Sequence, residues 1–225
     1  MNHDINIVRI KAVYNSLGDL KDKVVFAGGA AISLYPDRVA FEPRPTDDVD
    51  VLIELLNYTD RAQLEEKLRF LGFDHDKESG IVCRYIIQGI TVDIMPTTPE
   101  PSGFSNRWYP EGFKNAVAVH VDENTSIKIL SAPYFIATKL EAFKGRGNSD
   151  GRISHDFEDI IFVLENRQSI WDEMTNANGE LRDYFKNEFS ELTRNPYIIE
   201  WIDCHAEPGF PPLTKFILDK MKKLI

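Results

Sequence analysis

The sequence predicts an α/β (α+β) protein in which a mixed α/β half is followed by a bundle of helices. Segments that alternate apolar and polar residues, as half-buried strands do, are confined to about the first 130 residues. From Ser131 onward the apolar residues recur at helical spacing instead. With 225 residues and 43% hydrophobic content, the chain is long enough for two modest domains. We therefore expect an α/β domain at residues 1–130 and a helical domain at residues 131–225.

The first predicted elements lead into a turn at two glycines. Apolar residues at helical spacing predict a helix over residues 5–17 that ends near Gly18. The segment "KVVFAGG" predicts a short buried strand that turns at Gly28 and Gly29, and "AAISLY" opens a second helix. The next strand, "DDVDVLIEL", alternates valine with aspartate and so has one apolar and one polar face.

A helix and two hairpins complete the first half. The segment "TDRAQLEEKLRFLGF" predicts an amphipathic helix that ends at Gly72. The segment "IVCRYIIQGITVDIMP" predicts a hairpin that turns near Gln88-Gly89, and "AVAVHVDENTSIKIL" predicts another around residues 122–124. In the second half, "APYFIATKLEAFKG" and "SHDFEDIIFVLEN" are amphipathic, and two or three further helices extend to "KFILDKMKKLI".

The composition restricts the class of protein. The formal net charge of −10 argues against a protein that coats nucleic acid nonspecifically, because that activity needs a basic surface. Cys83 and Cys204 form no CxxC motif, so neither a disulfide framework nor a structural zinc is indicated. Cys83 lies in an apolar, strand-like run, where burial would raise its pKa and keep it inert. We expect a cytoplasmic protein with no membrane partner, because no apolar run could cross a bilayer and no basic segment precedes an apolar one at the N-terminus.

Three aspartates are the strongest candidates for a functional site. Residues two apart on a strand point to the same face with their Cα atoms roughly 6.5 Å apart, so Asp48 and Asp50 can converge on one or two divalent cations. Asp93 lies on the polar face of a later strand. If the two strands are neighbours, the three carboxylates meet, and they repel one another unless cations bind.

The chemistry that fits such a cluster is in-line phosphoryl or nucleotidyl transfer with two Mg²⁺ (or Mn²⁺) ions. Asp93 would serve the ion nearer the nucleophile and accept the proton of the nucleophile. The backbone N–H groups of Gly28 and Gly29, at the start of a helix, could receive phosphate oxygens. Taken alone, the Asp48 and Asp50 pair is more simply explained by protection of a strand edge, and the glycines by a tight turn that needs positive φ.

Together these residues resemble the nucleotidyltransferase superfamily. The resemblance is carried by the Gly28-Gly29 turn, the R-x-T-x-D-x-D strand that contains Arg44 and Thr46, and the later aspartate. With the helical second half, they look most like the abortive-infection AbiEii-type nucleotidyltransferases over residues 1 to about 165. The resemblance implies a nucleotidyltransferase-like mixed sheet flanked by helices and a C-terminal helical bundle that contributes to the nucleotide site. It also implies transfer of a nucleoside monophosphate from an NTP to a hydroxyl group.

The resemblance implies roles for residues of the helical half as well. Lys139 would contact the nucleotide phosphates. Asp156, which shares the segment "SHDFEDI" with Asp159, would face the nucleotide or orient a partner near it. From the residues alone, Lys139 is also explained as a surface lysine, and Asp156 as a partner of the helix dipole. The chain departs from the family at Ala30, where a Ser or Thr usually follows the glycines. A second departure is His155, where an Arg or Lys usually precedes the aspartate.

The acceptor is less specified. The resemblance implies a toxin-like role on tRNA or protein with a neutralising antitoxin partner, although other superfamily members use small acceptors such as aminoglycosides. The segment "KGRGNSDGR" is expected to be a flexible loop that holds Lys144, Arg146 and Arg152 beside the nucleotide site, and "RWY" at residues 107–109 adds a basic and aromatic group. Such residues could guide an RNA end. A solvated loop and a partly buried aromatic cluster explain them equally well.

Other classes of function fit the sequence less well. The His155-Asp156 pair lacks the further histidines of a metal-dependent phosphohydrolase, and no G-x-S-x-G motif occurs. The main alternative is a nucleotidyltransferase fold retained as a nucleotide-binding or interaction module with weak or no catalysis. Ala30 favours this alternative, whereas the three aspartates argue against it, because an unused carboxylate cluster is costly to keep.

Overall fold

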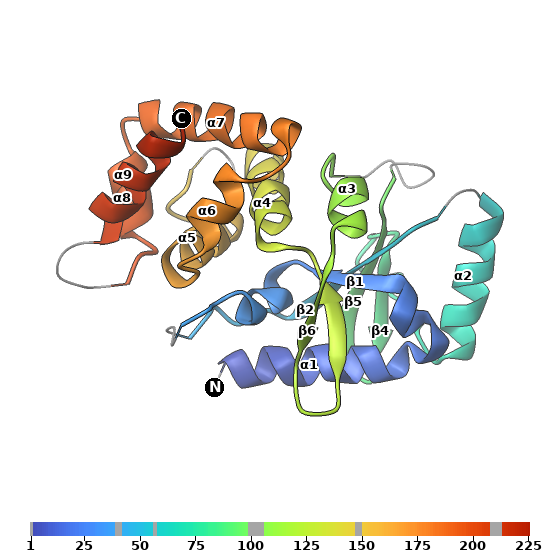
Figure 1. The fold of residues 1–225 in the computed structure, drawn as a ribbon. Coiled ribbons are helices and arrows are strands. Elements are labelled where there is room, and N and C mark those ends of the chain that lie inside the picture. Colours follow the sequence, from blue (N-terminus) through green and yellow to red (C-terminus); the bar gives the residue numbers. More distant parts are fainter. Residues whose placement is uncertain (1, 39–41, 56–57, 99–105, 147–149, 208–212) are drawn as a thin grey trace. The chain divides into compact units, whose positions relative to one another are not determined.

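The computed structural model describes residues 2–38, 42–55, 58–98, 106–146, 150–207 and 213–225 (Figure 1). Contacts within the chain divide it into two compact units, one formed by Met1–Leu34 with Glu42–Ser131 and the other by Tyr35–Phe41 with Ala132–Ile225. The segment that starts at Tyr35 therefore interrupts the first unit in sequence. It belongs with the helices, where the Tyr35 ring lies 4.4 Å from that of Phe135, measured between centroids.

The first unit is built on a mixed sheet, as the sequence predicts. Its strands lie in the order β3-β4-β5-β2-β1-β7-β6. The β2–β5 and β1–β7 pairs are parallel and the other neighbours are antiparallel. Strand β1 consists of apolar residues that are almost fully buried, which is typical of a strand covered on both faces. The strand bounds are β1 Val24–Ala27, β2 Asp48–Ile53, β3 Asp74–His75, β4 Arg84–Ile87, β5 Ile90–Pro96, β6 Val117–His120 and β7 Ser126–Ile129.

Both predicted hairpins are present in the first unit. Strands β4 and β5 are joined by Gln88 and Gly89, with φ of 52° and 77°. Positive φ at both central residues is the signature of a tight type I′ turn, whose twist matches that of the strands it joins. The β6–β7 hairpin follows the predicted course around residues 122–124. The short strand β3, which pairs with β4, was not predicted.

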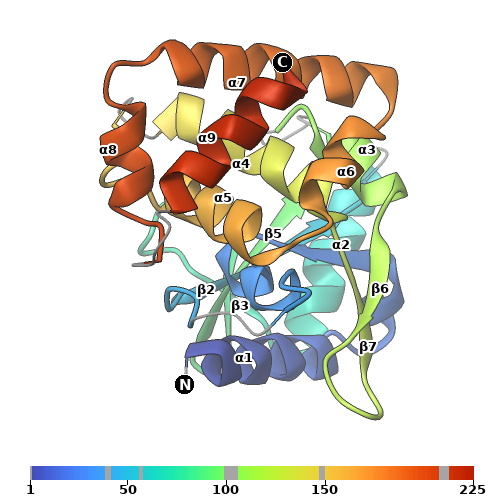
Figure 2. The same cartoon turned by 60° about the vertical axis from the view of Figure 1, so that its left-hand side comes forward.

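Helices accompany the sheet of the first unit. In α1, Ile10 and Val13 are fully buried, and this helix runs across the bottom of both views (Figures 1 and 2). The predicted helix after the glycines is a six-residue 3-10 helix, which stops before Pro36 because proline disfavours helical backbone at the residue that precedes it. The short helix α3 was not predicted. The bounds are α1 Asn2–Ser16, η1 Gly18–Lys23, η2 Gly29–Leu34, α2 Tyr58–Phe70 and α3 Tyr109–Lys114.

The second unit is helical in the part of the chain that the structure describes (Figure 2). Ser154 begins α5, and its Oγ accepts a hydrogen bond from the Phe157 N–H, which satisfies one open donor of the helix start. The rings of Phe143, Phe157 and Trp201 pack together with centroids 5.2 to 5.8 Å apart. No helix among the described residues is both long and apolar enough to cross a membrane. The bounds are α4 Ala132–Arg146, α5 His155–Asn166, α6 Ile170–Thr175, α7 Gly179–Arg194, α8 Ile198–Asp203 and α9 Leu213–Leu224.

Candidate active site on strands β2 and β5

The three predicted carboxylates lie on neighbouring strands. Strands β2 and β5 run parallel, with Asp50 opposite Asp93 and Asp48 opposite Thr91. Asp93 is largely buried, with 12% of its side chain exposed, whereas 36% of the Asp48 side chain is exposed. The condition on which the expected cluster depended, that the two strands be neighbours, is therefore met.

The two glycines make room for the side chains of the aspartate segment. Gly28 has a φ of +63°, and a Cβ at this residue would overlap the carboxylate of Asp50. A Cβ on Gly29 would lie 2.6 Å from Nη2 of Arg44 and 3.3 Å from Oγ1 of Thr46. At Gly28, both the backbone conformation and the close packing therefore require glycine, whereas a side chain at Gly29 would have to displace the end of Arg44. The space in which phosphate binding was expected is bordered by Asp50 and Arg44.

Thr46 orients the first aspartate of the motif. Its Oγ1 donates a hydrogen bond of 2.8 Å to Oδ1 of Asp48, and the Thr46 residue is only 5% exposed. A buried threonine with one strong acceptor holds its side chain in one rotamer, so the Asp48 carboxylate is held as well. From the sequence alone, Thr46 is only one of the residues that carry the family resemblance.

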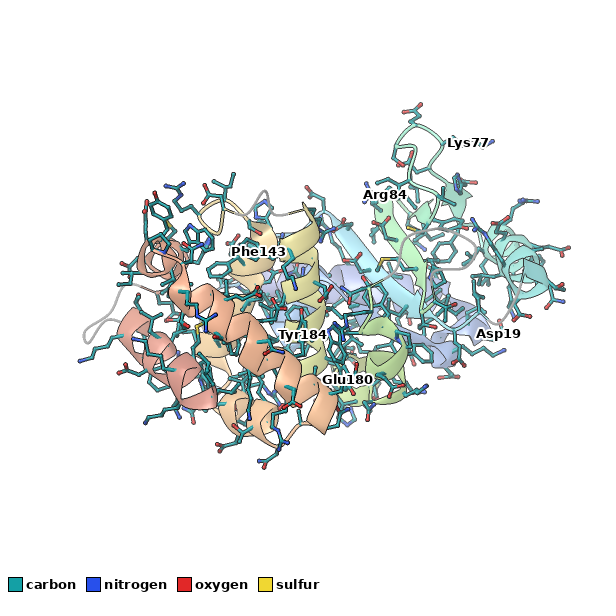
Figure 3. All side chains as sticks on the ribbon, turned by 90° about the horizontal axis from the view of Figure 1, so that it is seen from above. Asp19, Lys77, Arg84, Phe143, Glu180 and Tyr184 are labelled. Carbon is teal, nitrogen blue, oxygen red and sulfur yellow. The ribbon has the colours of Figure 1, made fainter. Side chains whose placement is uncertain are left out.

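Arg84 is a site residue that the sequence analysis did not identify. It projects from β4, and its Nε and Nη2 donate to the two carboxylate oxygens of Asp93 at 2.8 Å each (Figure 3). Its Nη2 also lies 3.5 Å from Oδ2 of Asp48. The hydrogen bonds to Asp93 raise the pKa of Arg84 above its ordinary value, although burial acts in the opposite direction. The sequence could have predicted this contact, because Arg84 and Asp93 are equally far from the Gln88-Gly89 turn. Residues at equal distances from the turn face each other in a hairpin.

The donor chemistry of the site suits a hard divalent cation, since carboxylate oxygens are the ligands that Mg²⁺ and Mn²⁺ prefer. The arrangement is at present that of an ion pair, with the Arg84 guanidinium across Asp48 and Asp93. Among the residues that the structure describes, no group of three or more His, Cys, Asp or Glu side chains is placed to hold a metal ion. The carboxylate oxygens are therefore suitable ligands for a divalent metal ion, but in this structure they are placed to bind the Arg84 guanidinium.

Cys83 lies beside this site but is not suited to nucleophilic chemistry. It occupies a turn before β4, not the middle of a strand as predicted, because β4 begins only at Arg84. Partial burial, together with the negative charge of Asp93, raises the pKa of Cys83 to about 11. The thiol is therefore protonated at neutral pH, in agreement with the expectation of an inert cysteine.

In the helical unit, Lys139 is buried in an ion-pair network. Only 6% of the residue is exposed, and its Nζ lies 3.1 Å from Oδ1 of Asp156 and 2.7 Å from Oδ2 of Asp159. Arg146 donates two further hydrogen bonds to Asp156, at 2.8 and 3.0 Å. Burial alone would raise the pKa of Asp156, but Arg146 and Lys139 lower it to about 2. Lys139 is thus not the surface lysine of the simpler explanation. His155, in contrast, is exposed and contacts Glu158 at 3.1 Å.

The basic residues proposed to guide an RNA end differ from expectation. Lys144 and Arg146 belong to the last turn of α4, not to a flexible loop, because the helix continues further than predicted; residues 147–149 lie outside the described part of the chain. Lys144 pairs with Glu188 at 2.7 Å, and Arg152 pairs with Asp150 at 2.7 Å and with Glu200 at 3.2 Å. Their charges are engaged by carboxylates of the same unit.

The aromatic residues of the "RWY" segment at residues 107–109 form a buried cluster, which was the simpler of its two explanations. Trp108 and Tyr109 are 2% and 9% exposed, so their rings are part of the core of the first unit. The Arg107 guanidinium lies 4.9 Å from the Trp108 ring centroid. A ring that is buried in the core and covered by a cation has no face on which a base could stack. This correction removes the predicted aromatic platform for RNA.

Comparison with known proteins identifies the class. The fold is similar to that in a study titled "Solution Structure of Antibiotic-Resistance Factor ANT(2'')-Ia Reveals Substrate-Regulated Conformation Dynamics", with a TM-score of 0.53. The two sequences are 17% identical, and the match covers 86% of this chain and 97% of that chain, so the likeness concerns the fold alone. No curated protein matches the sequence.

The seven-stranded mixed sheet with its helices is that of a nucleotidyltransferase fold. Residues 11–200 match the family described as nucleotidyl transferase AbiEii toxin, type IV TA system, and the chain belongs to this family. The resemblance derived from the sequence is confirmed, as is the assignment of the protein as a nucleotidyltransferase of a toxin family.

Proposed function

We propose that this protein is a metal-dependent enzyme that transfers NMP from an NTP to a hydroxyl group of a macromolecular acceptor. The observation that carries the proposal is the pairing of Asp50 with Asp93 on parallel strands, with Asp48 two residues from Asp50 on the same strand. Three carboxylates on two paired strands carry a high density of negative charge, which bound cations would offset.

Asp48, Asp50 and Asp93 would hold Mg²⁺ (or Mn²⁺). When bound, the ions supply charge neutralisation for the triphosphate and lower the pKa of the attacking hydroxyl. Thr46 keeps the Asp48 carboxylate in place through its 2.8 Å hydrogen bond, so this ligand is preorganised. Asp93 accepts the proton of the acceptor hydroxyl as the hydroxyl oxygen bonds to the α-phosphorus. The bond from that phosphorus to the pyrophosphate oxygen then breaks, and pyrophosphate leaves.

Four further residues are proposed to bind the nucleotide. Gly28 and Gly29 are proposed to offer their backbone N–H groups to a phosphate. The room that their missing side chains leave is taken by the Asp50 carboxylate and by Arg44. Lys139 and Asp156 are proposed as nucleotide contacts on the strength of the family resemblance. In the resting protein both are held by ion pairs within the helical unit, so a contact of Lys139 with phosphate requires exchange of its bonds to Asp156 and Asp159.

The proposed acceptor is tRNA or protein, and an antitoxin is the proposed partner. Both proposals derive from the family, which is described as the toxin of a type IV system. The net charge of −10 and the intramolecular ion pairs of Lys144 and Arg152 provide no general attraction for RNA. Recognition of tRNA would therefore need specific contacts. A second candidate is a nucleotide-binding or interaction module with weak or no catalysis, which is favoured by Ala30 and by the Arg84 guanidinium across two of the aspartates.

The test is incubation of the protein with each of the four α-labelled NTPs, Mg²⁺, total RNA and cell extract. Label on RNA selects tRNA-type acceptors, and label on protein selects protein nucleotidylation. The matched control is Asp50→Asn, which keeps the volume of the side chain and removes its charge. A wild-type protein that labels nothing, and that no NTP stabilises against thermal unfolding in the presence of Mg²⁺, would leave the binding or interaction module as the better description.

A further inference from the structure

The position between Asp48 and Asp93 is occupied by a cationic group of the protein itself. Nη2 of Arg84 lies 2.8 Å from Oδ2 of Asp93 and 3.5 Å from Oδ2 of Asp48, so one nitrogen is shared by carboxylates of two different strands. A divalent cation that bound both carboxylates would need the same volume, because its bonds to oxygen are only about 2.1 Å long for Mg²⁺. The guanidinium and the cation exclude each other.

We propose that Arg84 is a resident counter-ion of the carboxylate site, and that a divalent cation binds Asp48 and Asp93 by displacing it. This inference rests on the proposed function, since it takes the aspartates as the metal ligands. Arg84 thereby sets the affinity of the resting protein for metal. It is a positioning residue, because it acts through the aspartates and not on the substrate.

The geometry of the pair supports this role. Nε and Nη2 of Arg84 engage both oxygens of Asp93, which is the bidentate arrangement in which arginine binds carboxylates best. Each of the two Asp93 carboxylate oxygens therefore accepts a hydrogen bond from Arg84. On the other side, Oδ1 of Asp48 is held by Thr46, so that Oδ2 is the oxygen that faces Arg84. Both carboxylates are therefore presented to one cationic group at one place.

An ordinary structural pair does not explain the arrangement. Arg84 and Asp93 are cross-strand partners in the β4–β5 hairpin, and such pairs stabilise sheets. A cross-strand pair requires no second carboxylate, however, and the guanidinium reaches past its partner strand to Asp48 on β2. The contact with this second carboxylate distinguishes a counter-ion of the site from a hairpin contact.

The first experiment measures binding of Mn²⁺ alone to the full-length protein, by the loss of the electron paramagnetic resonance signal of the free ion. The variants are Arg84→Gln and, as a matched control, Arg9→Gln. Arg9 lies 3.6 Å from Asp47, the residue before Asp48, and Asp47 is fully exposed. Removal of a charge adjacent to the metal position is expected to lower the Kd for Mn²⁺ about tenfold or more in Arg84→Gln, and less than about twofold in Arg9→Gln, where solvent screens the charge.

A Kd in Arg84→Gln that equals or exceeds the wild-type value overturns the counter-ion role and leaves the proposed function intact. Absence of Mn²⁺ binding in the wild type and in Arg84→Gln overturns both, because no metal site then exists. Asp50→Asn serves as the specificity control, and its loss of Mn²⁺ binding assigns the measured ion to the aspartate site.

The second experiment follows displacement directly in the wild-type protein. The Nε–H resonance of Arg84 is observed in a ¹⁵N-labelled wild-type protein, and Arg84→Lys assigns it because lysine has no Nε–H. Saturating Mg²⁺ is expected to shift or broaden this resonance as the bond to Asp93 breaks. A resonance that stays unchanged while Mg²⁺ binds would mean that arginine and metal coexist, which contradicts the proposal.

Discussion

The carboxylate of Asp50 fills the space that a side chain on Gly28 would occupy. The backbone at Gly28 has a φ of +63°, and β1 pairs with β2 in antiparallel register immediately before this turn. The glycine turn and the aspartate strand therefore form one packed unit, in which the position of a proposed metal ligand depends on a residue that contributes no side chain.

Gly28→Ala tests this contact. The added methyl group displaces Asp50 and strains the backbone, so we expect loss of Mn²⁺ binding and a marked loss of stability in urea unfolding. The matched control is Gly89→Ala, because Gly89 also has positive φ, at 77°, but no atom lies within 4 Å of a Cβ there. We expect Gly89→Ala to lower the free energy of unfolding by about 1 kcal/mol through backbone strain alone. Gly28→Ala should lower it by at least about 2 kcal/mol more, because the added methyl group overpacks the site. Equal costs for the two variants would show that Asp50 moves away freely.

Thr46→Val tests the orientation of Asp48. Valine has the shape of threonine but cannot donate to Oδ1 of Asp48, so the carboxylate gains rotational freedom. We expect a loss of about tenfold to a hundredfold in metal affinity or transfer, as is usual for a hydrogen-bond partner of a metal ligand. Thr46→Ser retains the hydroxyl and should stay near the wild type. If both variants behave alike, the methyl group of Thr46, and not its hydroxyl, is what matters.

Lys139→Met tests the buried network of the helical unit. Removal of the ammonium group leaves Asp156 and Asp159 buried with less compensation, which costs about 3–5 kcal/mol of the free energy of unfolding. Lys144→Met is the control on the same helix; the Lys144 side chain is 47% exposed, so its pair with Glu188 should contribute less than about 1 kcal/mol. Adding Asp159→Asn to Lys139→Met should restore part of the stability. No restoration would mean that charge compensation is not the role of Lys139.

Glu165 makes the stability of the helical unit depend on pH. Burial raises the pKa of Glu165 from 4.5 to about 7, and the charge of Glu207 acts in the same direction, while the hydrogen bond from the Glu207 backbone N–H acts against it. Because the folded pKa is the higher one, the full stability is present below pH 4.5, falls as the pH rises towards 7, and is constant above that. Glu165→Gln should remove this fall and be more stable than the wild type at pH 8, by an amount on the order of 2–3 kcal/mol. If the free energies of unfolding of the two proteins change in parallel from pH 4.5 to 8, the pKa of Glu165 is not raised in the folded protein.

Much of the site could be predicted because its signals are local. The alternation of valine and aspartate on β2 places Asp48 and Asp50 on one face whatever the strand pairs with. The Gln88-Gly89 turn sets the register of the hairpin, and with it the pairing of Arg84 and Asp93, although the sequence analysis did not use this register. Lys144 and Arg146 were expected in a flexible loop because of the glycines and polar residues around them, whereas α4 continues to Arg146.

The sequence by itself determined the class of the protein and the face of each strand on which its carboxylates lie, because strand periodicity and turn residues act over a few positions. Only the tertiary structure decided that the Arg84 guanidinium is the cationic partner of Asp48 and Asp93. The contact of Arg84 with Asp48 joins residues 36 apart and exists only because β5 lies between β4 and β2. The burial of Lys139 likewise depends on the packing of α4 against α5, since an amphipathic pattern does not say whether a lysine at its border is covered.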